Sequence, residues 1–123
     1  MSILEVIKID VASQSVYMIQ ISATDTLQAY YEHIGCSTVS HFSFDAYHGC
    51  YVDDEGLFNQ HAGYWSLPGF IQAIAGNGIV SGVDEEGNTA SAEPEFLDWL
   101  QSCIQFYGAD EAAPEPDIQI VSF

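Results

Sequence analysis

Two runs rich in branched apolar residues open the sequence, and they constrain the fold more than any other feature. Residues 3–11 and 16–21 have the composition of β-strands, and only the short segment 12–15 separates them. Strands joined by so short a connection pair antiparallel. The sequence therefore predicts a β-hairpin, and with it a sheet that other segments must join.

Helical periodicity marks two later segments. In the first, apolar residues recur at i, i+3, i+4 and i+7, at Leu27, Tyr30, Tyr31 and Ile34. Gly35 follows as a stop signal, so we expect a helix over residues 24–34. A second helix is predicted to begin at Pro94, which suits a first helical position, and to run to Tyr107 before Gly108.

The remaining segments predict further strands. Residues 38–44 and 48–52 flank a turn and indicate a second hairpin, and residues 78–83 form a strand that ends in the acidic turn 84–88. We also expect irregular structure over 57–68, a short helix over 69–74, a linker over 109–116 and an edge strand over 117–123. A chain of 123 residues usually makes one domain. The prediction is a single α+β domain with a mixed or antiparallel sheet of five or six strands and two main helices.

Charge is distributed very unevenly in this chain. It has 18 acidic residues and one cation, Lys8, which gives a formal net charge of −17. A hydrophobic content of 48% is too high for a disordered acidic tail, so we expect a folded core. One cation cannot supply the phosphate contacts that dominate nucleic-acid affinity, which excludes a conventional DNA or RNA binder. The same shortage opposes docking on anionic membranes.

The expected compartment is the cytoplasm. Glu5 and Asp10 stand where a signal peptide needs a basic and then an apolar region, and no stretch is long and apolar enough to span a membrane. Three cysteines at wide spacings, Cys36, Cys50 and Cys103, fit reduced thiols better than disulfides.

Several motifs in the middle of the chain are similar to a known family. They are acidic and glycine-rich: the run 51–57, then Asn59 and Ala62, and then the run 74–87. These motifs resemble DUF3846, a domain family of unknown function common in phages and mobile elements. The resemblance covers about residues 1–92, because family members also begin with a strand hairpin and a short helix. Residues 93–123 have no counterpart in it, and we expect them to add a helix, a linker and an edge strand to the same domain.

That resemblance supplies no activity. It implies a mobile-element origin, and hence a small protein that interferes with host machinery.

Metal and catalytic chemistry find little support in the spacing of the side chains. Counted from Asp84, the acidic loop has Thr89 where a calcium-binding EF-hand requires glycine. In the predicted second hairpin Cys50 and His41 point to opposite faces, so they cannot share a zinc ion. No nucleophile motif is present. We therefore expect no enzymatic activity, metal or cofactor.

The acidity itself is the strongest functional signal. A domain of this length has a diameter of roughly 35 Å, and the net charge of 17 corresponds to about 29 Å of duplex DNA. We therefore expect a DNA mimic of the anti-CRISPR or antirestriction type, which binds a basic nucleic-acid-handling host protein. Candidate contacts are the acidic clusters and two loop aromatics: Asp53, Asp54, Glu55, Asp84, Glu85, Glu86, Glu93, Glu95, Asp98, Tyr64 and Trp65.

Two alternatives stay open. Gly76 and Gly78 allow close backbone approach, so a signalling nucleotide is an alternative ligand for a pocket at residues 76–83, although the loop lacks the Lys of a phosphate-binding loop. The other alternative is an acidic housekeeping interaction domain. Trp99 lies beside the apolar stripe of its helix and marks a candidate homodimer contact.

Overall fold

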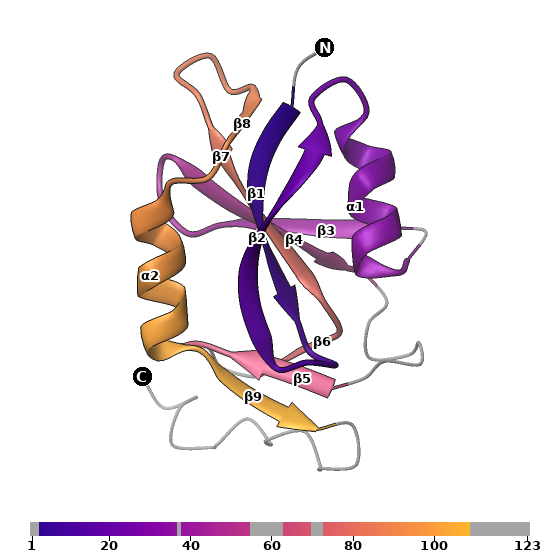
Figure 1. The fold of residues 1–123 in the computed structure, drawn as a ribbon, viewed down its shortest axis with the longest axis vertical. Helices are drawn as coiled ribbons and strands as arrows, with labels where there is room; N and C mark the ends of the chain where they lie inside the picture. Colours follow the sequence, from indigo (N-terminus) through magenta and orange to yellow (C-terminus); the bar gives the residue numbers. More distant parts are fainter. Residues whose placement is uncertain (1–2, 37, 55–62, 70–72, 109–123) are drawn as a thin grey trace.

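A six-stranded antiparallel sheet forms the centre of the molecule (Figure 1). The computed structural model describes residues 3–36, 38–54, 63–69 and 73–108. The strands of this sheet are β1 (Ile3–Asp10), β2 (Ser15–Ser22), β3 (Val39–Ser43), β4 (His48–Asp53), β7 (Gly78–Val83) and β8 (Thr89–Ala90). Their order is β2-β1-β7-β4-β3, with β8 paired beside β7. We call this the main sheet.

One helix covers each face of the main sheet, α1 (Thr26–Ile34) on one side and α2 (Pro94–Cys103) on the other (Figure 1). Alternate strand residues point to opposite faces. Ile7 and Ile9 therefore join a core with Leu100 of α2, whereas Val6 and Ile79 join a core with Ile34 of α1. The predicted α+β domain with two main helices is confirmed.

Both predicted hairpins are present. β1 and β2 pair along their whole length. In the second hairpin Phe42 is opposite Cys50 and His41 is opposite Tyr51. The rings of His41 and Tyr51 lie 4.8 Å apart on the α1 face, while Cys50 is buried on the α2 face. The expected separation of His41 and Cys50 is confirmed. The predicted helix stop is also correct, since Gly35 has a left-handed φ of 81°.

A smaller three-stranded sheet corrects three predictions. It consists of β5 (Gly63–Ser66), β6 (Ile74–Ala75) and β9 (Gln105–Gly108), in the order β6-β5-β9. Residues 63–66 are a strand where we expected irregular structure, and Ile74 is in a strand where we expected the end of a short helix. The helix predicted to reach Tyr107 ends at Cys103, because the following residues pair with β5 instead. This tertiary pairing overrides the helical periodicity. The linker and edge strand predicted over 109–123 lie outside the described residues.

Candidate interaction surface

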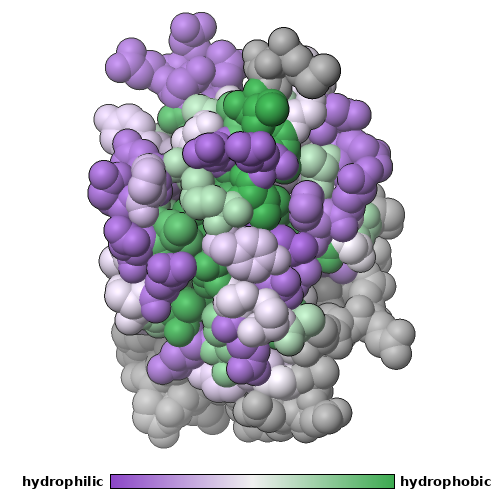
Figure 2. Space-filling model, in the orientation of Figure 1, coloured by the Kyte–Doolittle hydropathy of each residue, from purple (hydrophilic) through white to green (hydrophobic). Residues whose placement is uncertain are grey.

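The turn between β7 and β8 carries three of the predicted acidic contacts. Oδ1 of Asp84 accepts the backbone N–H groups of Glu86 at 2.9 Å and Asn88 at 2.8 Å. The Asp84 side chain therefore fixes the turn, and Gly87 provides the left-handed residue in it, with φ 84°. Asp84, Glu85 and Glu86 are all exposed. The turn projects from the top of the main sheet, where the surface is hydrophilic (Figures 1 and 2).

The start of α2 brings three more acidic residues to the same end of the main sheet. Glu93 is the N-cap residue and Pro94 occupies the first turn, as predicted. Glu95 lies in the first turn and Asp98 in the next, and all three carboxylates are exposed. A negative charge near a helix N-terminus stabilises the helix by about 0.3–1 kcal/mol. Part of this acidity therefore also stabilises α2.

A buried histidine connects α2 to the turn between β3 and β4. Nδ1 of His48 lies 3.2 Å from Oδ1 of Asp45, and Nε2 accepts the backbone N–H of Glu93 at 3.4 Å. Because Nε2 is an acceptor, Nδ1 carries the proton and donates it to the Asp45 carboxylate. The imidazole also stacks on Phe96, with ring centroids 4.1 Å apart. This arrangement holds Asp45 beside the acidic residues of α2.

The same hydrogen bonds keep Asp45 charged. Burial alone would raise the pKa of its carboxyl group, but hydrogen bonds from the Tyr47 N–H and from His48 lower the pKa below the ordinary value of 3.8. The Asp45 carboxylate is therefore negative throughout the neutral range.

Together these segments form one surface, which we call the acidic end: Asp45, Asp84, Glu85, Glu86, Glu93, Glu95 and Asp98. The Val83 N–H donates to the Tyr47 carbonyl at 2.8 Å, which ties the start of the β7–β8 turn to the β3–β4 turn. Two aromatic side chains border the surface, Tyr47 with 61% of its area exposed and Trp99 with 46%. Trp99 rests against Phe96, with centroids 5.3 Å apart.

Sequence reasoning missed Asp45 and Tyr47 as members of this surface. The signal available was the turn chemistry of residues 45–47, which predicted the hairpin correctly. Placing that hairpin beside the β7–β8 turn requires the strand order of the main sheet, which has no local sequence signal.

Asp53 and Asp54 lie at the other end of the main sheet. Val52 is paired with Gly78 at the start of β7, whereas Asp84 follows the end of β7. At the rise of a β-strand this places Asp53 about 20 Å from Asp84. The acidic clusters predicted from the sequence therefore do not form one continuous surface. Glu55 lies outside the described residues.

The structure corrects the prediction that Trp65 contacts a partner. Trp65 is fully buried in the core beneath the main sheet and is paired with Phe106 of β9. Tyr64, the preceding residue on β5, points to the opposite face and is half-buried. Trp65 is buried because side chains alternate between the two faces of β5. The sequence prediction does not use this alternation, because it treats the segment as a loop.

The glycine-rich strand β7 belongs to the core. A Cβ atom on Gly78 would lie 3.3 Å from the Trp65 ring, and one on Gly82 would lie only 2.2 Å from the carbonyl oxygen of Ser91. Both glycines therefore permit close packing around the central strand. This packing accounts for the glycines without a ligand.

Asn77, which lies between Gly76 and Gly78, also has a structural role. Its Oδ1 accepts the Val11 N–H at 2.9 Å, and its Nδ2 donates to the His33 carbonyl at 3.2 Å. Asn77 thus joins the end of β1 to the end of α1 just before β7 begins. These contacts give no support to the alternative of a nucleotide pocket at residues 76–83.

Cation sites and membrane spans were sought over the described ranges. Those ranges contain no group of three His, Cys, Asp or Glu side chains able to hold a metal ion. Neither α1 nor α2 has the length and apolar character needed to cross a membrane.

Comparison with known proteins identifies the family of the chain. Residues 3–105 match the family model of DUF3846, a domain of unknown function. The match includes α2 and the first residue of β9, which corrects the expectation that the resemblance ends at about residue 92 and that the second helix has no counterpart in the family. No curated protein and no solved structure matches the chain.

Proposed function

Because this chain belongs to the DUF3846 family, whose function is unknown, we propose its function from its surface: it inhibits a basic nucleic-acid-handling protein by DNA mimicry. The observation that carries the proposal is a net charge of −17 with a single cation in the whole chain. Solubility alone needs a net charge of only about 2–8. The excess charge repels itself and destabilises the compact state, so a binding role accounts for it better.

The acidic end is the surface that we assign to this role. Its carboxylates come from three segments that are held together by the Asp84 turn, the His48 hydrogen bonds and the start of α2. Backbone segments that are already held in place lose little conformational entropy on binding, which favours affinity. Tyr47 and Trp99 offer aromatic faces beside them, and such faces attract the guanidinium groups of arginine.

The proposed setting is the cytoplasm of a host cell, with an anti-CRISPR or antirestriction target and a phage or mobile-element source. The proposed mode of action is non-enzymatic. A basic groove that normally binds duplex DNA would be occupied by the acidic end, and association would weaken steeply with ionic strength.

The test is capture of partners from host lysate at low salt, elution with a salt gradient, and displacement by duplex DNA. We expect a stoichiometric nucleic-acid-binding protein that DNA displaces. A variant with Asp84→Asn, Glu85→Gln and Glu86→Gln should release this partner at lower salt. The matched control, Asp53→Asn with Asp54→Asn at the other end of the main sheet, should elute as the wild type does.

Equal effects of the two variants would remove the acidic end from the proposal, and a captured protein that DNA does not displace would argue against mimicry. Asn at position 84 retains a side-chain oxygen that accepts the turn N–H groups, so the fold should survive. Circular dichroism and a melting curve of each variant check this.

A further inference from the structure

The outer edge of β2 carries backbone hydrogen-bonding groups that no other described strand uses. Gln101 of α2 donates to the Val16 carbonyl at 2.9 Å from outside the β1–β2 ladder. In an antiparallel edge strand the backbone N–H and C=O groups of every second residue point away from the neighbouring strand. Those of Met18 and Gln20 therefore point away from β1, as the Val16 carbonyl does. Among the residues that the structure describes, β1 alone pairs with β2. None of the described strands therefore pairs with these outward N–H and C=O groups of Met18 and Gln20.

This edge lacks the usual protection against a further strand. Natural edges are blunted by charged side chains, proline, bulges or short length. β2 has eight residues, contains neither charge nor proline, and pairs with β1 in unbroken register. Figure 2 shows hydrophobic side chains at the upper middle and lower left of the viewed face, with hydrophilic side chains among and around them. Tyr17 is 37% exposed and Ile3 of the neighbouring β1 is 56% exposed.

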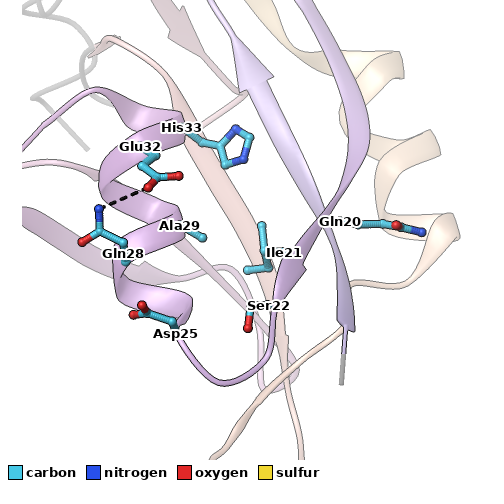
Figure 3. A pocket seen from close by; sticks show the side chains of 8 residues that line it. All are labelled: Gln20, Ile21, Ser22, Asp25, Gln28, Ala29, Glu32 and His33. Atoms are coloured by element: carbon cyan, nitrogen blue, oxygen red, sulfur yellow. Dashed lines mark hydrogen bonds between the residues drawn. The ribbon is translucent and has the colours of Figure 1, made fainter. Parts of the chain in front are cut away.

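A groove of about 300 Å³ runs beside the same edge, between β2 and α1 (Figure 3). Ile21 and Ser22 line it from β2, and Asp25, Glu32 and His33 line it from the helix side. A hydrogen bond of 3.2 Å from the neighbouring Gln28 holds the Glu32 carboxylate (Figure 3).

The lining of the groove is acidic. Burial, assisted by the nearby Lys8, lowers the pKa of His33, so its imidazole is neutral at neutral pH and does not offset the two carboxylates. Lys8 offsets at most one of the two carboxylates, so a cationic side chain entering the groove would still meet net negative charge.

We propose that the β2 edge binds an extended basic segment of a partner protein as an added strand, with a Lys or Arg side chain of that segment in the groove. Backbone pairing with Met18 and Gln20 supplies affinity, and the Asp25 and Glu32 carboxylates select the cation. This site uses other residues than the acidic end and does not depend on DNA mimicry.

A second copy of the chain fits this edge less well. β2 carries no cation that could face Asp25 and Glu32 across a two-fold axis, and pairing would bring together two proteins of net charge −17. Charge complementarity therefore favours a basic segment.

The probe is a synthetic acetylated nine-residue peptide in which valine alternates with lysine or threonine. Two further versions of the peptide carry N-methyl groups on alternate residues. In one version the methyl groups block the N–H groups that would pair with the β2 edge, and in the other they block the N–H groups that would point away from it. We expect binding by calorimetry and slower hydrogen exchange at the Met18 and Gln20 amides. The version methylated on the edge-facing N–H groups should bind about tenfold or more weakly, and the version methylated on the outward-facing groups should bind as the unmodified peptide does. Equal affinity of both versions would overturn strand addition, because charge alone would then explain binding.

Two variants test the site from the side of the protein. Asp25→Asn with Glu32→Gln should weaken binding of the lysine peptide about tenfold and hardly change binding of a version with norleucine in place of lysine. Met18→Pro removes an outward N–H and should abolish binding, whereas His41→Pro, on the opposite edge strand, should not. The N-methyl comparison decides the question if Met18→Pro does not fold. Protection of the Met18 amide without peptide, together with dimers in sedimentation, would assign the edge to a second copy instead.

Discussion

The central strand β7 of the main sheet and residues 84–86 of the acidic end are adjacent in the sequence, yet their physical roles are opposite. Residues 78–82 are buried in the central strand, whereas residues 84–86 are exposed in the turn that follows. Both belong to the run 74–87, which carries much of the family resemblance. The contrast shows that one sequence motif can combine a packing part and a solvent-exposed part. A shared motif is therefore not by itself a binding site.

Substitution of the two tryptophans should give the largest difference in stability between the buried centre and the acidic end. Trp65 is fully buried in the centre, so Trp65→Ala should lower the free energy of unfolding by about 3–5 kcal/mol. Trp99 is 46% exposed beside the acidic end, so Trp99→Ala should cost about 1 kcal/mol or less. Urea unfolding followed by circular dichroism measures both. A cost for Trp99→Ala as large as that for Trp65→Ala would show that the border of the acidic end is part of the core.

Two glycines give the next largest difference. Gly82→Ala should cost about 3 kcal/mol, because the new Cβ would collide with the Ser91 carbonyl and the backbone must shift. Gly87→Ala in the exposed turn meets no atom within 4 Å and should cost only about 1–2 kcal/mol, for its left-handed φ. Melting curves at neutral pH compare them. A larger loss at Gly87 would mean that turn conformation matters more than packing around β7.

The pH dependence of Asp45 tests whether its charged carboxylate, which accepts hydrogen bonds from His48 and Tyr47, orders the acidic end. Its pKa is lowered in the folded state, so its contribution to stability is complete above the ordinary value of 3.8 and is lost as the pH falls through the lower folded value. Asp45→Asn should therefore be less stable than the wild type at pH 6, and the difference should shrink as the pH falls below 3.8 through the lowered pKa of Asp45. Melting temperatures from pH 6 to pH 2.5 provide the measurement. A difference that stays constant with pH would exclude a role for the charge.

The smallest effect is expected in the turn itself. Glu85→Gln with Glu86→Gln should change the free energy of unfolding by about 0.5 kcal/mol or less, because both side chains are exposed. At low ionic strength the change should be stabilising, since like charges are removed, and added salt should erase it. Thermal melts at low and high salt test the sign. Destabilisation at both salt concentrations would indicate that these glutamates support the fold.

The parts of the fold that the sequence predicts are those with local signals. The hairpin of β1 and β2, the helix α1 with its Gly35 stop, and the Asp84 turn all follow from periodicity and turn residues within a few positions. β5 and β9 are short strands whose partners lie far along the chain, so pairing rather than propensity determines them. The same pairing ended α2 earlier than its periodicity indicates.

For the candidate surface, the sequence correctly predicts that Asp84 to Glu86 and Glu93 to Asp98 contain exposed acids. It cannot predict that these two groups share one end of the main sheet while Asp53 lies at the other, because that depends on the register of β4 against β7. The burial of Trp65 has a separate cause, since it depends on β5 being a strand that pairs with β9 far along the chain.

The burial of Cys50 makes its thiol a probe of how often the main sheet opens. Its thiol is fully enclosed and burial raises its pKa, whereas Cys36 and Cys103 are only partly covered. A thiol reagent would react with Cys36 and Cys103 in the closed protein and with Cys50 only during a rare opening of the main sheet. With serine at positions 36 and 103, and with enough reagent that labelling is faster than reclosing, the rate of Cys50 labelling would equal the rate of opening under native conditions. The lifetime of the closed state would then follow from the labelling rate of one thiol.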